Sequence, residues 1–265
     1  LVMYAEASGL TKSFDVLGEL YGSMDGFEEG MQQLATGLAS LGLDLEEDIL
    51  SFMDKGYAFG LYDQGGIIPG IGIFIDASSN PDGGMKTMGV IAQNIEAGLV
   101  SLPPESEGVV VFEKNEDGSA YKLSLDFSAL PEEEAVGIPP QIAEESFEFH
   151  FGVNGDDLAY FALYAGFDGE WNTVAENAEF MAGLDMIPGF DRSVAYFDVA
   201  GLMDYVDRIM RFAMVMEGGS ADDVDAMAEY QMVRQYLGPI KSMVMGGAEA
   251  GESSVELEGF ILMGE

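Results

Sequence analysis

The chain has 265 residues, of which 48 are Asp or Glu and 10 are Lys or Arg, so its formal net charge is −38. The absence of cysteine excludes disulfides and thiolate metal sites, and the one histidine, His150, excludes a histidine-rich zinc site. A nucleic-acid surface needs clustered cations, whereas the ten here are scattered, which excludes DNA and RNA as partners. Apolar residues make up 48% of the chain, enough to form the core of one large or two ordinary domains.

Composition also bears on compartment. No run of 18 or more apolar residues is present, so we expect no transmembrane span in this chain. The first residue is Leu1 and the segment after it already has the pattern of a strand, so we expect a processed piece, with any signal peptide or anchor outside it. The few lysines and many carboxylates suit a salty or extracellular setting, where added salt or divalent cations should raise stability.

The chain begins with a segment that recurs later. Val2–Leu10 matches Val194–Leu202 at a constant offset, with Val, Tyr, Gly and Leu identical and an acid at the same place. Each stretch alternates like a strand and passes through glycine into a helical pattern. The pattern therefore predicts an internal duplication.

Each copy is followed by the same order of expected elements, namely two helices and then two strands. The elements predicted after the first copy are helices over 27–41 and 44–52, with Asp44 as N-cap, and strands over 57–62 and 71–75. Those predicted after the second copy are a helix containing Met203, Met210 and Met214, a helix over 221–237 with Ser220 as N-cap, and strands over 242–246 and 254–263.

The segment between the copies predicts helices at both of its ends and two hairpins between them. The helices are expected over 85–99 and 170–181, and the hairpins over 109–112 with 121–127 and over 147–151 with 159–163. The proline-rich stretch 130–140 is the best linker candidate, which separates a first α+β half, 1–130, from a second, 141–265, packed as one continuous unit. We expect an α+β fold of mostly antiparallel sheets with helices on one face.

Three stretches of the chain, 1–10, 41–60 and 193–202, carry a resemblance to a known family. The segment Gly42-Leu43-Asp44-Leu45-Glu46-Glu47-Asp48-Ile49-Leu50 is typical of them. They resemble a bacterial secreted or periplasmic family catalogued as domain of unknown function number three-three-five-two. In that family, a glycine–hydrophobic–acid helix start leads into a strand in the same way. The family has no established activity, so the resemblance implies an envelope location and assigns no catalytic residue or cofactor.

One segment invites a phosphate-loop interpretation, because Gly83-Gly84-Met85-Lys86-Thr87 follows a strand and opens a helix. The phosphate loop requires glycine directly before the lysine, and Met85 stands there instead. Asp82 would also face the phosphates. We therefore interpret the segment as a turn and a helix cap.

Acidic turns suggest weakly bound divalent cations such as calcium, which prefers clustered carboxylate and carbonyl oxygens. Glu113, Asn115, Asp117 and Gly118 have EF-hand spacing, but Ser124 stands where the closing glutamate belongs, and a hairpin turn is the favoured interpretation. Weaker candidate ligands across neighbouring loops are Asp76, Asn80 and Asp82, together with Asp156, Asp157 and Asp168.

Two further features concern side chains with possible chemistry. By alternation, His150 lies opposite Phe149 and Phe151 on its strand, so we expect an ordinary surface or cross-strand residue. The 17 methionines either pack the core or line an adaptable hydrophobic groove, because methionine is flexible and polarisable. The groove candidates are Met203, Met210, Met214, Met227 and Met232.

Taken together, these features predict a non-enzymatic secreted or cell-envelope protein, located in the periplasm, at the cell surface or outside the cell, with a structural or binding role and no cofactor. The alternative is an extracytoplasmic carrier of a hydrophobic ligand in the methionine-rich groove. A carboxylate-dependent hydrolase is a third hypothesis, which would need two buried carboxylates of raised pKa facing one cleft. An envelope protein, a second copy of the chain and a hydrophobic ligand remain open as partners.

Overall fold

The computed structural model describes residues 2–8, 27–103, 108–130, 146–155, 157–163, 177–187, 193–216, 224–251 and 254–264. They form ten strands and six α-helices with short π- and 3-10 turns, which confirms the α+β class. The strands make one antiparallel sheet in the order β10-β9-β8-β1-β2-β3-β7-β6-β5-β4. No helix in this described part of the chain is long and apolar enough to span a membrane.

The chain divides into two compact units of discontinuous segments, whereas the predicted halves, 1–130 and 141–265, are each continuous. Unit 1 comprises Leu1–Glu6, Phe59–Ile71 and Asp168–Glu265, and unit 2 comprises Ala7–Ala58 and Gly72–Phe167. The predicted linker lies almost wholly outside the described residues.

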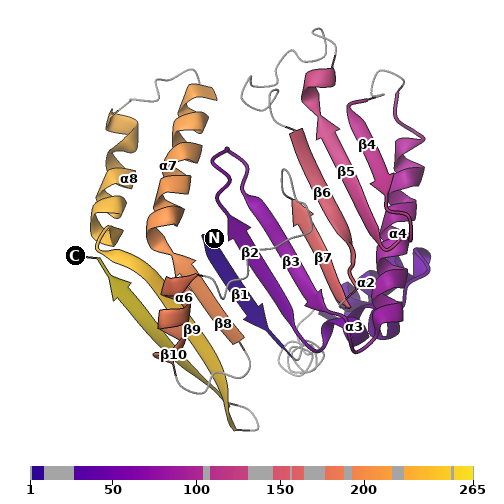
Figure 1. Ribbon diagram of the computed structural model, residues 1–265, viewed down its shortest axis with the longest axis horizontal. Coiled ribbons are helices and arrows are strands. Elements are labelled where there is room, and N and C mark those ends of the chain that lie inside the picture. Colours follow the sequence, from indigo (N-terminus) through magenta and orange to yellow (C-terminus); the bar gives the residue numbers. More distant parts are fainter. Residues whose placement is uncertain are drawn as a thin grey trace. The chain divides into compact units, whose positions relative to one another are not determined.

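Unit 2 places helices against one face of its strands (Figure 1). Its helical elements are α2 (Phe27–Ser40), the π-helical turn η1 (Leu45–Leu50), α3 (Ser51–Met53), α4 (Pro81–Leu99) and the 3-10 turn η3 (Phe127–Ala129). Its strands are β4 (Val110–Lys114), β5 (Ala120–Asp126), β6 (Ser146–Val153) and β7 (Leu158–Leu163), with most of β3 (Gly70–Asp76). Both predicted hairpins and the helix over 85–99 are thereby confirmed.

The core of unit 2 follows from strand alternation. Residues directly opposite each other on paired strands share a face, and Tyr121 on β5, Phe151 on β6 and Phe161 on β7 lie opposite one another in register. The Tyr121 and Phe151 rings stack at 5.0 Å between centroids, and those of Phe151 and Phe161 at 6.2 Å. Met88 of α4 belongs to the same buried cluster. The aromatic row is therefore the surface on which α4 packs.

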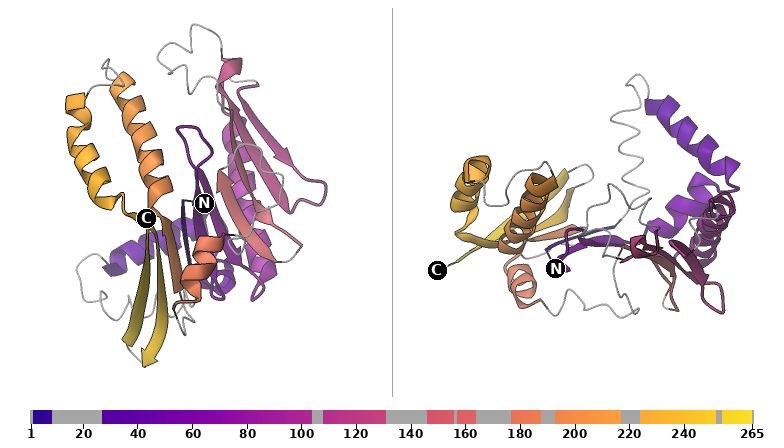
Figure 2. Two further views of the ribbon diagram at one scale, coloured as in Figure 1. Left: turned by 60° about the vertical axis from the view of Figure 1, so that its left-hand side comes forward. Right: turned by 90° about the horizontal axis from the view of Figure 1, so that it is seen from above.

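Unit 1 contains most of β1 (Met3–Ala7) and of β2 (Tyr57–Tyr62), together with β8 (Ser193–Asp198), β9 (Ile240–Gly251) and β10 (Ser254–Met263). Its helices are α6 (Ala178–Leu184), α7 (Val199–Met216) and α8 (Val224–Leu237). Figure 2 shows α6 on one side of the β8–β10 strands and α7 with α8 on the other. Helix α6 thus departs from the predicted arrangement with helices on one face, because Phe180 packs on Tyr196 and Val244.

Of the predicted helix over 170–181, residues 170–176 lie outside the described residues, and the described helix α6 begins at Ala178 after its N-cap Asn177. The order strand, helix, helix, hairpin occurs in both proposed copies, from β1 to β3 and from β8 to β10. Whether the copies are structurally equivalent stays a prediction. Ser220, the expected N-cap of α8, lies outside the described residues.

Candidate functional site

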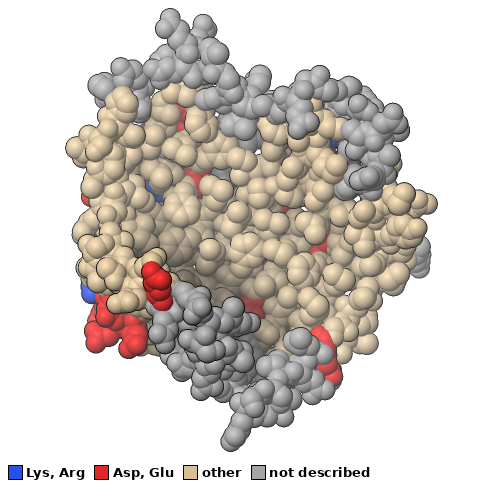
Figure 3. All heavy atoms as spheres, turned by 180° about the vertical axis from the view of Figure 1, so that it is seen from behind, with Lys and Arg blue, Asp and Glu red and all other residues tan. Residues whose placement is uncertain are grey.

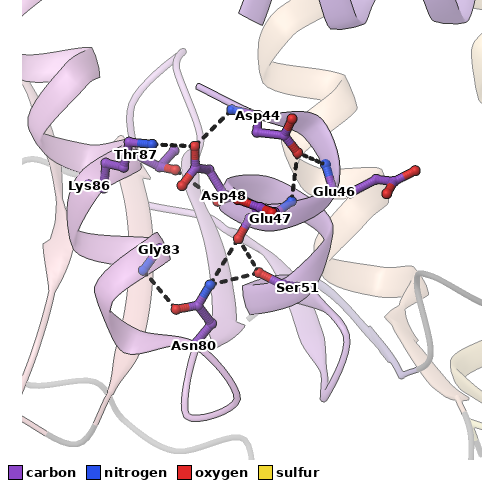
Figure 4. Close-up of polar contacts among 9 residues, drawn as sticks. All are labelled: Asp44, Glu46, Glu47, Asp48, Ser51, Asn80, Gly83, Lys86 and Thr87. Atoms are coloured by element: carbon purple, nitrogen blue, oxygen red, sulfur yellow. Dashed lines mark hydrogen bonds and ion pairs between the residues drawn. The ribbon is translucent and has the colours of Figure 1, made fainter. Parts of the chain in front are cut away.

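A cluster of polar contacts in unit 2 joins η1 to the start of α4 (Figure 4). Asp44 caps η1, and its Oδ1 accepts hydrogen bonds from the backbone N–H groups of Glu46 and Glu47 at 2.9 and 2.8 Å. The Asp48 carboxylate accepts from the Asp44 N–H at 2.7 Å and from Lys86 Nζ at 2.5 Å. These reciprocal bonds fix the turn by the same logic as a capping box.

Asn80 links the two helical elements a second time. Its side-chain oxygen accepts from the Gly83 N–H at 3.0 Å, which caps α4, and its Nδ2 donates to the Glu47 carbonyl and to Ser51 Oγ. Thr87 Oγ1 donates to the Asp48 carbonyl at 3.0 Å. The polar groups of this cluster thus bond to one another, which is what a structural junction requires.

The contacts between η1 and α4 also show whether residues 83–87 form a phosphate loop. Gly83 and Gly84 lie inside α4 and do not form a loop. Lys86 forms an ion pair with Asp48, so its ammonium group already contacts a carboxylate. The Lys86 ammonium and the Asp44 N–H hold the pKa of the Asp48 carboxyl below its ordinary value of 3.8. The segment is therefore not a phosphate loop, but neither is it the predicted turn and cap: α4 begins at Pro81 with Asn80 as its N-cap, and residues 83–87 lie within its first turns.

The first group of candidate metal ligands does not point at a common centre. Asp76 Oδ1 accepts from the N–H and the hydroxyl of Ser78, which lowers the pKa of Asp76. Asn80 faces η1 and α4, as described above, and Asp82 is exposed in the first turn of α4. No group of three or more His, Asp or Glu able to hold a metal ion occurs within the described ranges.

The second group belongs to the β4–β5 turn. Asn115 Oδ1 accepts from the Ala120 N–H at 3.0 Å, and Asp117 Oδ1 accepts from the Ser119 N–H and hydroxyl. The Ser119 bonds lower the pKa of Asp117. Gly118 has φ +74°, the left-handed conformation that glycine adopts without strain. The favoured interpretation as a hairpin turn is confirmed. Of the remaining candidates, Asp156 and Asp168 lie outside the described residues.

His150 lies on the sheet face opposite the aromatic row, as its alternation predicts. Its register partner on β5 is Lys122, and its Nε2 lies 3.1 Å from Glu148 Oε2. Lys122 Nζ lies 2.5 Å from Glu113 Oε2, and these acidic neighbours raise the pKa of Lys122. The histidine is more enclosed than a surface residue, because its side chain is 13% exposed.

The methionine candidates in unit 1 belong to the helical pair α7 and α8, which lie side by side in both figures. Met203, Met210 and Met214 are half-buried on α7, while Met232 on α8 is 59% exposed. The Met227 side chain is not among those described. Arg234 of α8 donates to Asp204 of α7 at 2.6 Å, and this ion pair links the two helices.

An exposed apolar surface on β9 and β10 was not predicted from the sequence. Met243 and Ile261 are register partners, so Met245, Ile261 and Met263 lie on the same sheet face, opposite the face on which Val244 and α6 pack. Met245, Ile261 and Met263 are 44%, 52% and 57% exposed. We call these three residues the β9–β10 apolar strip. The run of uncharged, mostly large apolar residues over 259–263 was the signal that could have revealed it.

Figure 3 shows how the described acidic side chains are distributed on one face. They occur there as separate groups between wide areas of uncharged residues. The carboxyl groups of Asp48, Asp63, Asp76 and Asp117 have their pKa lowered by hydrogen-bond donors, Arg208 being the donor to Asp63.

Comparison with protein-family models, curated proteins and solved structures found no match to this chain.

Proposed function

We propose that the chain is a non-enzymatic secreted or cell-envelope protein that binds a partner through an apolar surface of unit 1. The observation that carries this proposal is the β9–β10 apolar strip. Large apolar side chains scattered singly on a surface are ordinary, but neighbours sharing one sheet face indicate an interaction site. Two of its three members are methionines, whose flexible side chains adapt to varied partners.

The electrostatics support the non-enzymatic part of the proposal. A carboxylate-dependent hydrolase needs one carboxyl group whose pKa is raised, so that it stays protonated as a general acid. The carboxyl groups of Asp48 and Asp76 instead have a lowered pKa, because hydrogen-bond donors favour their charged form. The proposed extracytoplasmic location rests on the net charge of −38 and on the family resemblance. Fractionation of the source cells tests it, and recovery in the cytoplasm would contradict it.

Binding of a neutral fluorescent probe tests the proposed surface. Nile red brightens on apolar surfaces and carries no charge, so the acidic chain does not repel it. We expect Ile261→Gln with Met263→Gln to reduce probe binding. A matched control is Val100→Gln in unit 2, which changes a side chain that is 88% exposed. Equal probe binding by all three proteins would contradict the proposal.

A carrier of a hydrophobic ligand is the second candidate function. The observation that favours it is the set of half-buried methionines on α7, a helix in which Val199 and Tyr205 are buried and most other described residues are only partly covered. Native mass spectrometry of the purified protein would show a co-purifying lipid. In that case Met210→Gln, rather than the change at Ile261, should release the ligand.

A further inference from the structure

Strand β10 forms one edge of the sheet. Among the described residues its only partner strand is β9, and no described strand lies along the other side of its backbone. An edge presents unpaired N–H and C=O groups at alternate residues, which makes it a template for another extended chain. At ten residues, β10 is also longer than a typical strand.

The second half of β10 lacks the features that commonly protect an edge. The segment Gly259–Met263 contains no charged residue and no proline, and Ile261 and Met263 are more than half exposed. The opposite edge differs, because β4 has five residues and ends with Glu113 and Lys114. Short, charged edges resist pairing, whereas an open, apolar edge favours it. The contrast marks β10 as the edge suited to a partner strand.

The charges of unit 1 indicate which partner. The lysines and arginines within its described ranges already contact carboxylates: Arg208 with Asp63, Arg211 with Asp207, Arg234 with Asp204, and Lys241 with Glu179. Glu258 on β10 is exposed. A second copy of a chain with net charge −38 would therefore bring repulsion, while a basic segment would be attracted.

We propose that β10 binds an extended basic segment of a partner protein, which adds a strand to the sheet and alternates apolar with basic side chains. The apolar set would lie on the face of Ile261 and Met263. The basic set would lie on the other face, which Glu258 shares with Phe260. This inference rests on the proposed function, since it names the partner that the apolar strip of unit 1 receives.

A labelled peptide of about eight residues that alternates valine and lysine tests the proposal by fluorescence anisotropy. Its control has the same sequence, with N-methyl groups on the backbone amides of every second residue, so that charge and side chains are retained while one hydrogen-bonding edge is blocked. Two registers of methylation block the two edges in turn. We expect one methylated register to bind at least about tenfold more weakly than the parent peptide. Equal binding of all three peptides would overturn strand addition.

A pair of variants separates contact from long-range charge. Ile261→Lys and Met232→Lys each add one positive charge at a side chain more than half exposed, on β10 and on α8. We expect Ile261→Lys to weaken peptide binding at least about tenfold and Met232→Lys less than about twofold. Similar losses in both, with folding verified by circular dichroism, would overturn the site on β10.

Two further outcomes bear on the proposal. Sedimentation showing a wild-type dimer that Ile261→Lys dissociates would identify a second copy as the occupant and overturn the basic partner. Nile red binding that depends on Ile261, without any peptide binding, would overturn this inference and leave the proposed function standing. If the wild-type protein bound neither Nile red nor the peptide, both the proposed function and this inference would be overturned.

Discussion

Gly183 offers the sharpest test of packing in unit 1, because α6 approaches β9 at this residue. A Cβ placed on Gly183 would lie 2.9 Å from the Val244 Cβ and closer still to Val244 Cγ2. Ordinary carbon–carbon contacts begin near 3.5 Å, so Val244, 1% exposed on its strand, would have to shift by more than about half an ångström. Such overpacking costs about 1–3 kcal/mol, while alanine in place of glycine favours the helix by about 0.5–1 kcal/mol. We expect Gly183→Ala to lower the free energy of unfolding by about 1–2 kcal/mol.

The companion substitution is Val244→Ala, which removes the clashing methyl groups. Alone it should cost about 2 kcal/mol, since two buried methyl groups are lost. In the double variant the new Cβ partly refills that space, so its loss should be about that of Val244→Ala alone. Urea unfolding monitored by circular dichroism measures the four free energies, and a coupling of about 1–2 kcal/mol is expected. Gly37→Ala in α2, where nothing lies within 4 Å, is the control and should be slightly stabilising. Strict additivity at Gly183 and Val244 would refute the contact.

Three other outcomes are expected. Asp48→Asn should lower stability at neutral pH by about 1–3 kcal/mol, because the Asp44 N–H and Lys86 lose a charged acceptor. Folding lowers the pKa of Asp48, so the stabilisation by its carboxylate is complete above the ordinary value of 3.8 and is lost as the pH falls through the lowered pKa. Asp48→Asn should therefore lose less stability on acidification than the wild type does. Parallel profiles of stability against pH for the two proteins would contradict this. Gly152→Ala should destabilise more than Gly183→Ala, because the new Cβ would lie 2.7 Å from the Ala120 Cα, and backbone yields less than a side chain; equal unfolding midpoints would argue against it. The Tm should rise between about 10 mM and 1 M NaCl, as the screening length falls from about 30 to 3 Å, and a constant Tm would show that net charge does not limit stability.

Local sequence patterns predicted most strands and helices, but they did not predict which distant segments pair or contact one another. Tyr57–Tyr62 and Ser254–Met263 occur as strands at the predicted bounds, since alternation and turn residues act over a few positions. The position of β7 beside β3, however, depends on contacts between segments far apart in the chain. The same holds for the bond between Asp48 and Lys86.

The site was predicted less well than the fold. The methionine candidates are concentrated on helices, as spacing suggested, but the β9–β10 apolar strip was missed. Alternation shows that Ile261 and Met263 share a face, yet only the sheet order shows that nothing among the described residues pairs with the far side of β10. The candidate metal ligands failed to converge because Asp76 and Asp117 are used by their own turns, a local competition that residue type alone does not reveal.

The internal pairing of the described cations has a consequence for solution behaviour. With Arg208, Arg211, Arg234 and Lys241 all engaged, the surplus carboxylates must be accompanied by mobile counterions from the solvent. A basic strand arriving at β10 would displace some of those ions, and their release would favour binding in dilute salt. Added salt should therefore raise the stability of the folded chain but lower its affinity for a basic partner. Folding stability and binding affinity should respond to salinity in opposite directions.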